Sequence, residues 1–246
     1  MENPTYLAIN HLSALQRQME VIANNVANAS TTGFKGQRIL FAEMLNSQAT
    51  NPGLAQGSRV AFVEEVGMLR DTRDGQLIST GNSLDLAING SGYFAVETPG
   101  GTRYTRDGRF RLGADGRIVS QDGFALLDQG GRPISIRPGE SRIEISRTGR
   151  ITTESGEAGR IQVARFENEQ SLRTQGGGLL SSDAEPQQSD TPVDVRQGML
   201  EGSNVQTVTE ITNMIEVLRR YQSAQRIVDT EGDRTRRTIE RLAKVG

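Results

Sequence analysis

The chain lacks cysteine and tryptophan altogether, and His11 is its single histidine. Without cysteine, a disulfide framework, a cysteine-based metal site and thiol catalysis are excluded. One histidine cannot build a histidine-rich metal site, and its position within a predicted helix favours an exposed or interfacial side chain over a general base. We also find no convergent set of acid and base groups. The sequence therefore predicts a protein that is not an enzyme, with no catalytic residue, no cofactor and no metal site.

Neither sign of charge predominates, and no long apolar run occurs. The 28 Lys and Arg residues nearly balance the 30 Asp and Glu residues, so the sequence offers no electrostatic footprint for nucleic acid or an anionic membrane. The opening residues, MENPTYLAIN, contain neither a basic segment nor a continuous apolar segment. We therefore expect no cleaved signal peptide, no direct membrane insertion and no nucleic-acid partner.

The N-terminal residues have the periodicity of a helix. Asn3-Pro4 is typical of a helix start, because Asn caps free N–H groups and Pro is tolerated at the first helical position. Apolar residues then alternate at spacings of four and three, which is the pattern of a coiled-coil seam. The pattern ends near Asn28 and predicts a helix within residues 1–30. Its seam consists of Ala8, Leu12, Leu15, Met19, Ile22 and Val26.

Asn24, Asn25 and Asn28 share one arc of this predicted helix, nearly opposite the seam. Asparagine is a mediocre helix former, but its short amide offers two donors and an acceptor for close contact with a neighbouring backbone or subunit. Two interpretations stay open from the residues alone. The asparagines are either solvated side chains near a frayed helix end, or contacts of a helix that is covered on both sides in a multi-subunit assembly.

A second helix is predicted within residues 203–246. Ser203 and Gln206 have the spacing of a capping box. A helix of this length cannot bury an apolar stripe within a small globule, so we expect it to pair with the N-terminal helix as a coiled coil. Its seam follows the same alternating spacing through Ile211, Met214, Leu218, Tyr221, Gln225 and Val228, of which Gln225 is a weak member.

Turn sequences and short β-prone runs alternate between the two helices. Asp-Gly and Gly-Gly pairs separate runs such as YFAV, RFRL and RIVS, at the spacing expected of antiparallel hairpins. Residues 83–202 are predicted to form an all-β domain, and residues 31–82 an extended linker or β-hairpin region. The tetrapeptide TRDG occurs at 72–75 and at 105–108, which we interpret as repeated turn chemistry. The predicted fold class is α+β, with the terminal helices paired as a coiled coil and an antiparallel all-β middle domain.

The segments IANNVANASTTGFK and LEGSNV, the latter followed by EITNMIEVLRRYQ, resemble the two terminal signatures of the bacterial flagellar rod and hook protein family. LDLAINGSGYFAV, YTRDGRF and GRIVSQDGFALL extend the resemblance over nearly the whole chain. It implies a structural subunit of the axial drive shaft, which transmits torque and encloses the export channel. The opening residues and the chain length are most similar to members from the proximal rod. Distal-rod members are the alternative within the family, and a non-flagellar coiled-coil interaction protein is the alternative outside it.

The resemblance also implies partners, location and site residues. The partners are copies of the chain itself, other proximal and distal rod subunits, and the flagellar type III export apparatus. Family members leave the cell through this apparatus without a cleaved signal peptide, which implies a location in the basal-body rod within the periplasmic space. Gly33 is expected to supply unusual backbone torsions and Phe34 an anchor against an outer layer. Residues that match the two signatures are expected to serve packing and assembly: Asn24, Asn25, Asn28, Thr32, Gly33, Phe34, Lys35, Glu201, Gly202, Ser203, Asn204 and Val205.

Overall fold

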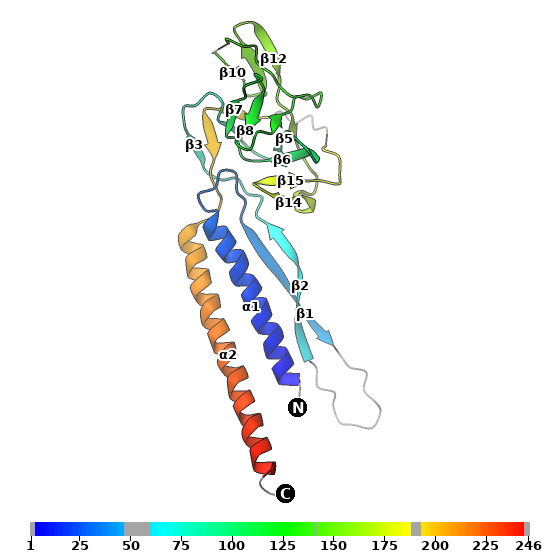
Figure 1. Ribbon diagram of the computed structural model, residues 1–246, viewed down its shortest axis with the longest axis vertical. Coiled ribbons are helices and arrows are strands. Elements are labelled where there is room, and N and C mark those ends of the chain that lie inside the picture. The colour runs from blue at the N-terminus through cyan, green and yellow to red at the C-terminus, as the bar shows by residue number, and fades with distance from the viewer. Residues whose placement is uncertain (1–2, 47–59, 141, 188–192, 244–246) are drawn as a thin grey trace. The chain divides into compact units, whose positions relative to one another are not determined.

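The computed structural model describes residues 3–46, 60–140, 142–187 and 193–243, which divide into two compact units (Figure 1). The helical unit takes in Met1–Ala27, Gln37–Arg70 and Gln206–Gly246, and the β-rich unit takes in Asn28–Gly36 and Asp71–Val205. Both units are discontinuous in sequence, so the chain passes between them four times. In the described residues, no helix combines the length and the apolar character needed to cross a membrane.

The helical unit contains α1 (Asn3–Ala27) and α2 (Thr207–Ala243). The two helices meet in an apolar cluster at whose centre Leu15 and Ile22 of α1 pack with Val217 and Ala224 of α2. Burial of these side chains removes apolar surface from water and is the main source of stability for the contact. Partly buried side chains complete the cluster: Leu12, Met19, Val26, Met214 and Tyr221.

A long antiparallel ribbon also packs against α1. It consists of β1 (Gln37–Asn46) and β2 (Val60–Arg70), and a shift in pairing register between Leu40 and Phe41 marks a β-bulge. Both strands contact α1 (Figure 1). An isolated two-stranded ribbon is marginally stable in water, so packing against the helix supplies the stability that the ribbon needs.

The predicted coiled coil is wrong, whereas an α+β fold with a mostly antiparallel middle is consistent with the structure. A β ribbon covers part of α1, and of the predicted α2 seam the apolar cluster contains only Met214 and Tyr221. Ile211 and Leu218 are exposed, and Val217 and Ala224 are buried in their place. Apolar residues occupy several faces at the start of α2, so periodicity alone does not select one register. Ala224 is selected because its small side chain lets the helices approach closely.

The β-rich unit consists of short antiparallel strands in four sheets among the described residues. One sheet has the order β14-β15-β6-β5-β9-β8-β7, with β13 paired to β5, and another has the order β10-β11-β12. Two further pairs, β16 with β4 and β17 with β3, bring the segment before α2 onto residues 77–88. The bounds are β3 (Leu77–Ser79), β4 (Leu86–Ile88), β5 (Tyr93–Thr98), β6 (Gly101–Thr105), β7 (Phe110–Leu112), β8 (Ile118–Ser120), β9 (Ala125–Leu126), β10 (Glu144–Ile145), β11 (Arg150–Thr153), β12 (Gly156–Arg160), β13 (Val163–Ala164), the 3-10 helix η1 (Glu169–Ser171), β14 (Arg173–Gly176), β15 (Leu179–Ser181), β16 (Val195–Gln197) and β17 (Met199–Glu201).

Two apolar clusters form the core of this unit. The larger one joins strands from β4 to β16 and includes Phe94 and Phe110, whose rings meet edge to face at 5.3 Å between centroids. The smaller one contains Tyr93, Tyr104 and Phe166. Such aromatic pairs stabilise a core by about 0.5–1.5 kcal/mol beyond the area that they bury. The unit therefore has a core of its own, built without α1 or α2.

Asn25 pairs with a backbone peptide group inside the helical unit. Its Nδ2 donates to the carbonyl of Gln37 at 2.8 Å, and its Oδ1 accepts from the N–H of Gln37 at 2.9 Å. The same Nδ2 lies 3.5 Å from the carboxylate of Glu210 on α2. The buried amide thus holds the first residue of β1 against α1, whereas Asn24 next to it is exposed. Asn25 therefore differs from both interpretations drawn from the sequence.

We expect Asn25→Ala to lower the free energy of unfolding by about 1–3 kcal/mol, because it takes away the side-chain partners of the partly buried peptide group of Gln37. Gln16→Ala, at an exposed position of the same helix, is the control. It is expected to change stability by less than about 0.5 kcal/mol, since alanine is the better helix former at an exposed position. Thermal unfolding and amide exchange at Gln37 measure both effects. Equal stability of the two variants would contradict this role of Asn25.

Candidate functional site

The two segments that carry the terminal signatures meet within the β-rich unit. The N–H of Gly33 donates to the carbonyl of Glu201 at 2.7 Å, and the N–H of Asn204 donates to the carbonyl of Phe34 at 3.3 Å. The N–H of Gly36 donates to Oδ1 of Asn204 at 2.8 Å. Residues 33–36 and 201–204, far apart in sequence, are therefore held together by their backbones.

A third segment, residues 71–75, joins the same place. The side-chain amide of Asn204 donates to the carbonyls of Asp71 and Arg73, at 2.9 Å each. The N–H of Asp71 donates to the carbonyl of Gly36 at 2.7 Å. Asn204 thus connects three segments, and a hydrophobic side chain of similar size could not satisfy these backbone groups.

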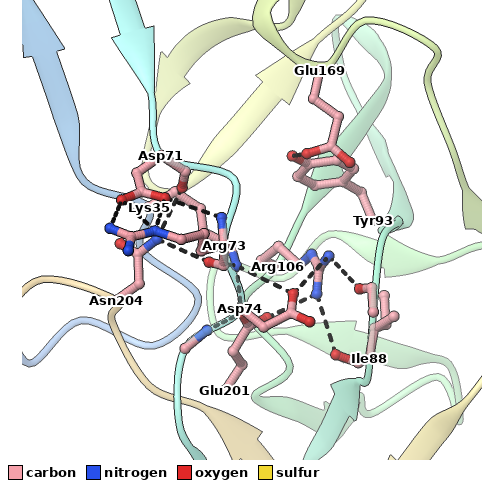
Figure 2. Close-up of polar contacts among 12 residues, drawn as sticks. Lys35, Asp71, Arg73, Asp74, Ile88, Tyr93, Arg106, Glu169, Glu201 and Asn204 are labelled. Atoms are coloured by element: carbon pink, nitrogen blue, oxygen red, sulfur yellow. Dashed lines mark hydrogen bonds and ion pairs between the residues drawn. The ribbon is translucent and has the colours of Figure 1, made fainter.

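A group of charges, which we call the clasp, lies among these segments and consists of Lys35, Asp74, Arg106 and Glu201 (Figure 2). Glu201 Oε1 lies 2.6 Å from Lys35 Nζ, and Glu201 Oε2 lies 2.9 Å from Arg106 Nη1. The side chains of Lys35, Arg106 and Glu201 are 4%, 3% and 1% exposed. One carboxylate therefore bridges two cations away from water.

Nearby backbone groups meet most of the hydrogen-bonding capacity of the buried charges, although Arg106 Nε is buried without a hydrogen-bond partner. Lys35 Nζ donates to the carbonyl of Arg73 at 2.8 Å, and the N–H of Gly75 donates to Glu201 Oε1 at 2.9 Å. Arg106 donates to the carbonyls of Ile88 at 3.2 Å and Gly90 at 2.6 Å. Buried ions are tolerated where such bonds accompany the ion pair, and removal of one partner then costs about 3–5 kcal/mol.

Asp74 balances the charge of the clasp from its solvent side. Its Oδ1 lies 3.8 Å from both Lys35 and Arg106, and its side chain is 45% exposed. With Asp74 the clasp has two positive and two negative charges. Asp74 contributes less than Glu201, because water screens a half-exposed carboxylate.

The clasp extends into the β-rich core through an aromatic ring. The guanidinium carbon of Arg106 lies 5.3 Å from the centroid of the Tyr93 ring, and the Tyr93 hydroxyl donates to Glu169 of η1 at 2.9 Å. Figure 2 shows this succession of side chains. A cation over an aromatic face is stabilised by the ring's quadrupole, more so when it is desolvated. Arg106 is thereby held from two sides.

Gly33 is required by both its torsions and its surroundings. Its φ is +68°, and a Cβ at this position would lie 2.4 Å from the carbonyl carbon of Arg106. Gly75 has no such torsion, but a Cβ there would lie 1.9 Å from the carbonyl oxygen of Gly202. Close approach of the segments that carry the clasp thus depends on glycine.

The remaining signature residues lie around these contacts. Asn28 accepts from the N–H and the hydroxyl of Thr31 in the turn that follows α1. Thr32 and Phe34 are half-buried, and Ser203 Oγ accepts from the N–H of Val205. Asn24 and Asn25 belong to the helical unit, as do all the residues predicted for the two seams.

Arg106 and Asp74 were not among the sequence-predicted site residues. Asp74 belongs to the first copy of TRDG and Arg106 to the second, but the arginines of the two copies have different environments. Arg106 is buried in the clasp, whereas Arg73 is 76% exposed and pairs with Asp71. The hydrogen bond to Asp71 and its charge raise the pKa of Arg73. The repeated tetrapeptide is the sequence feature that could have pointed to Arg106 and Asp74, although it does not indicate which of the two arginines is buried.

Three families match separate parts of the chain. Residues 6–35 match "Flagella basal body rod protein", residues 87–153 match "Flagellar hook protein FlgE/F/G D1 domain", and residues 196–241 match "Flagellar basal body rod FlgEFG protein C-terminal". Lys35, Arg106 and Glu201 fall in these three regions in turn. The clasp therefore connects all three.

Full-length relatives agree with these matches. The flagellar basal-body rod protein FlgF of Caulobacter vibrioides is 37% identical over 100% of both chains. FlgG of Agrobacterium fabrum is 35% identical, over 91% of this chain and 93% of its own, and FlgF of Rhizobium meliloti is 31% identical, over 94% and 95%. The chain belongs to the flagellar basal-body rod protein family.

Membership of the rod protein family agrees with the chemistry of the site. As a rod protein, the chain is a structural subunit of the basal-body rod and not an enzyme, and it assembles with other rod proteins. In the described part of the chain, no group of three or more His, Asp or Glu residues has the arrangement of a metal site. The charges of the clasp hold segments of the chain together.

We expect Gly33→Ala to lower the free energy of unfolding of the β-rich unit by about 3 kcal/mol or more, because strain at positive φ adds to overlap with the Arg106 backbone. Gly123→Ala is the matched control. Gly123 also has a positive φ, +86°, but no atom lies within 4 Å of its added Cβ, so only the strain of about 1–2 kcal/mol remains. Urea titrations of both variants measure the difference, and equal losses would refute the packing argument.

Proposed function

We propose that this rod protein is a subunit of the proximal rod, built into the axial tube through its terminal helices. The FlgF relative from Caulobacter vibrioides, which matches over the full length of both chains, supports the proximal position. The FlgG relative from Agrobacterium fabrum is nearly as similar, so a distal-rod position is the alternative. The tube formed by such subunits would transmit torque and enclose the export channel.

The observation that carries this proposal is an exposed apolar stripe at the start of α2. Val208, Ile211, Ile215 and Leu218 recur at spacings of three and four residues, with exposures between 42% and 80%. At about 100° per residue, the stripe lies roughly 150° around the helix from the Val217 and Ala224 face. Such spacing suits packing against another helix, and burial of the stripe would stabilise an assembly by about 25 cal/mol per Å².

We also propose that the chain reaches the rod through the flagellar type III export apparatus, without a cleaved signal peptide, and works in the periplasmic part of the basal body. Membership of the rod protein family supports this route. The signature residues would serve assembly indirectly. Their contacts within the β-rich unit would fix the segments from which the helices extend.

Ile211→Asp combined with Leu218→Asp is expected to leave thermal unfolding of the purified chain within about 2 °C, since both side chains are already exposed. Incorporation into basal bodies and swimming motility are expected to be lost, because a buried unpaired carboxylate is costly. Both are measured in a strain that lacks the native copy. Leu112→Asp, an exposed apolar position in the β-rich unit, is the control and is expected to retain both. Normal incorporation of the double variant would contradict assembly through this stripe.

The order in which rod subunits assemble distinguishes a proximal position of this chain from a distal one. In cells that lack the distal-rod protein, a proximal subunit is expected to be present in purified basal bodies at its wild-type ratio to the other proximal components. An immunoblot of the basal bodies measures this ratio. A distal subunit would be absent from them. Loss of the chain from these basal bodies would therefore favour the alternative position.

A further inference from the structure

The clasp joins residues that are far apart in sequence. Lys35 and Glu201 are separated by 166 positions, and Arg106 and Glu201 by 95. In contrast, the sheets of the β-rich unit contain pairs of neighbouring strands, such as β5 with β6, β7 with β8, and β11 with β12. Chain entropy must be lost before distant contacts contribute, so nearby pairs form first.

The charges of the clasp cannot be buried in the protein interior one at a time during folding. Glu201 alone would bury an unpaired carboxylate, and Lys35 with Arg106 alone would bury two like charges. The backbone contacts of Gly33 and Asn204 reach across the same segments, so they form together with the ion pairs. The pairing of residues 33–36 with residues 201–204 is therefore a single step. It requires that the β-rich core on which these segments pack has already folded.

We propose that closing of the clasp is the last step in folding of the β-rich unit, and that the closed clasp keeps the unit from unfolding. The apolar core between β4 and β16 forms before it. The clasp then closes when residues 35, 74, 106 and 201 meet. Interactions absent from the folding transition state slow unfolding and leave the folding rate unchanged.

This order has a consequence that rests on the proposed function. A chain that is exported N-terminus first delivers Lys35 and Arg106 before Glu201. The clasp then stays open until the segment that precedes α2 has arrived. The β-rich unit would become kinetically stable only when the chain is complete up to residue 204.

Folding and unfolding rates of the full-length chain test the proposal. Lys35→Met keeps the Glu201–Arg106 pair and is expected to unfold at least about 30-fold faster in urea, with refolding within about twofold of the native rate. Arg73→Met, in the other copy of TRDG, is the matched control and is expected to change neither rate by more than about twofold. Pulsed hydrogen exchange of peptides from residues 86–126 reads the β-rich unit separately from the helical unit.

Asp74→Asn is the second variant, because it retains all three buried charged side chains and preserves folding. It is expected to unfold about threefold faster with an unchanged refolding rate. Slower refolding of either variant would show that the clasp forms early, and unchanged unfolding would show that it does not hold the unit closed. Either result would overturn the proposal. Because both rates are measured on the purified chain, they do not depend on whether it assembles into a rod.

Discussion

The carboxylate of Glu201 is the interaction on which the rest of the β-rich unit depends. It is 1% exposed and binds Lys35 and Arg106 at once, so it balances one of these two buried positive charges, and Asp74 balances the other. These partners lie on the segment after α1 and directly after β6. Glu201 itself ends β17. A single side chain thus places three separate parts of the chain, and Asn204, three residues later, adds the segment after β2.

The identity of the cation at position 35 follows from the space around it. Lys35 and Lys244 are the two lysines of a chain in which all other basic side chains are arginine. Lys35 contacts one carboxylate oxygen and one carbonyl, which suits a compact ammonium group. Arg106 contacts a carboxylate, two carbonyls and an aromatic face, which suits a planar guanidinium. The two cations are therefore not interchangeable, although both pair with Glu201.

Local patterns predicted the local parts of this fold. Helical periodicity indicated α1 and α2, and Asp-Gly turns with β-prone runs indicated the antiparallel middle. The coiled coil failed because α2 has apolar residues on several faces, and the choice of Val217 over Leu218 depends on the shape of α1. The clasp could not be predicted from the sequence for a similar reason. Arg73 and Arg106 stand in identical tetrapeptides, and contacts with Glu201 and Tyr93, distant in sequence, bury one of them and not the other.

The signature residues and the exposed stripe of α2 are under different physical constraints. This difference explains why the sequence identified the family but not the position within the rod. Gly33, Lys35, Glu201 and Asn204 are constrained by backbone contacts, a positive φ or buried charge, and few other residues satisfy those conditions. The exposed stripe of α2 needs only apolar side chains at the right spacing, which many sequences provide. Constraints of the first kind produce recognisable motifs and mark the family. Under the proposed function, constraints of the second kind decide which subunits pack together, so a strong family signature is compatible with nearly equal similarity to FlgF and FlgG relatives.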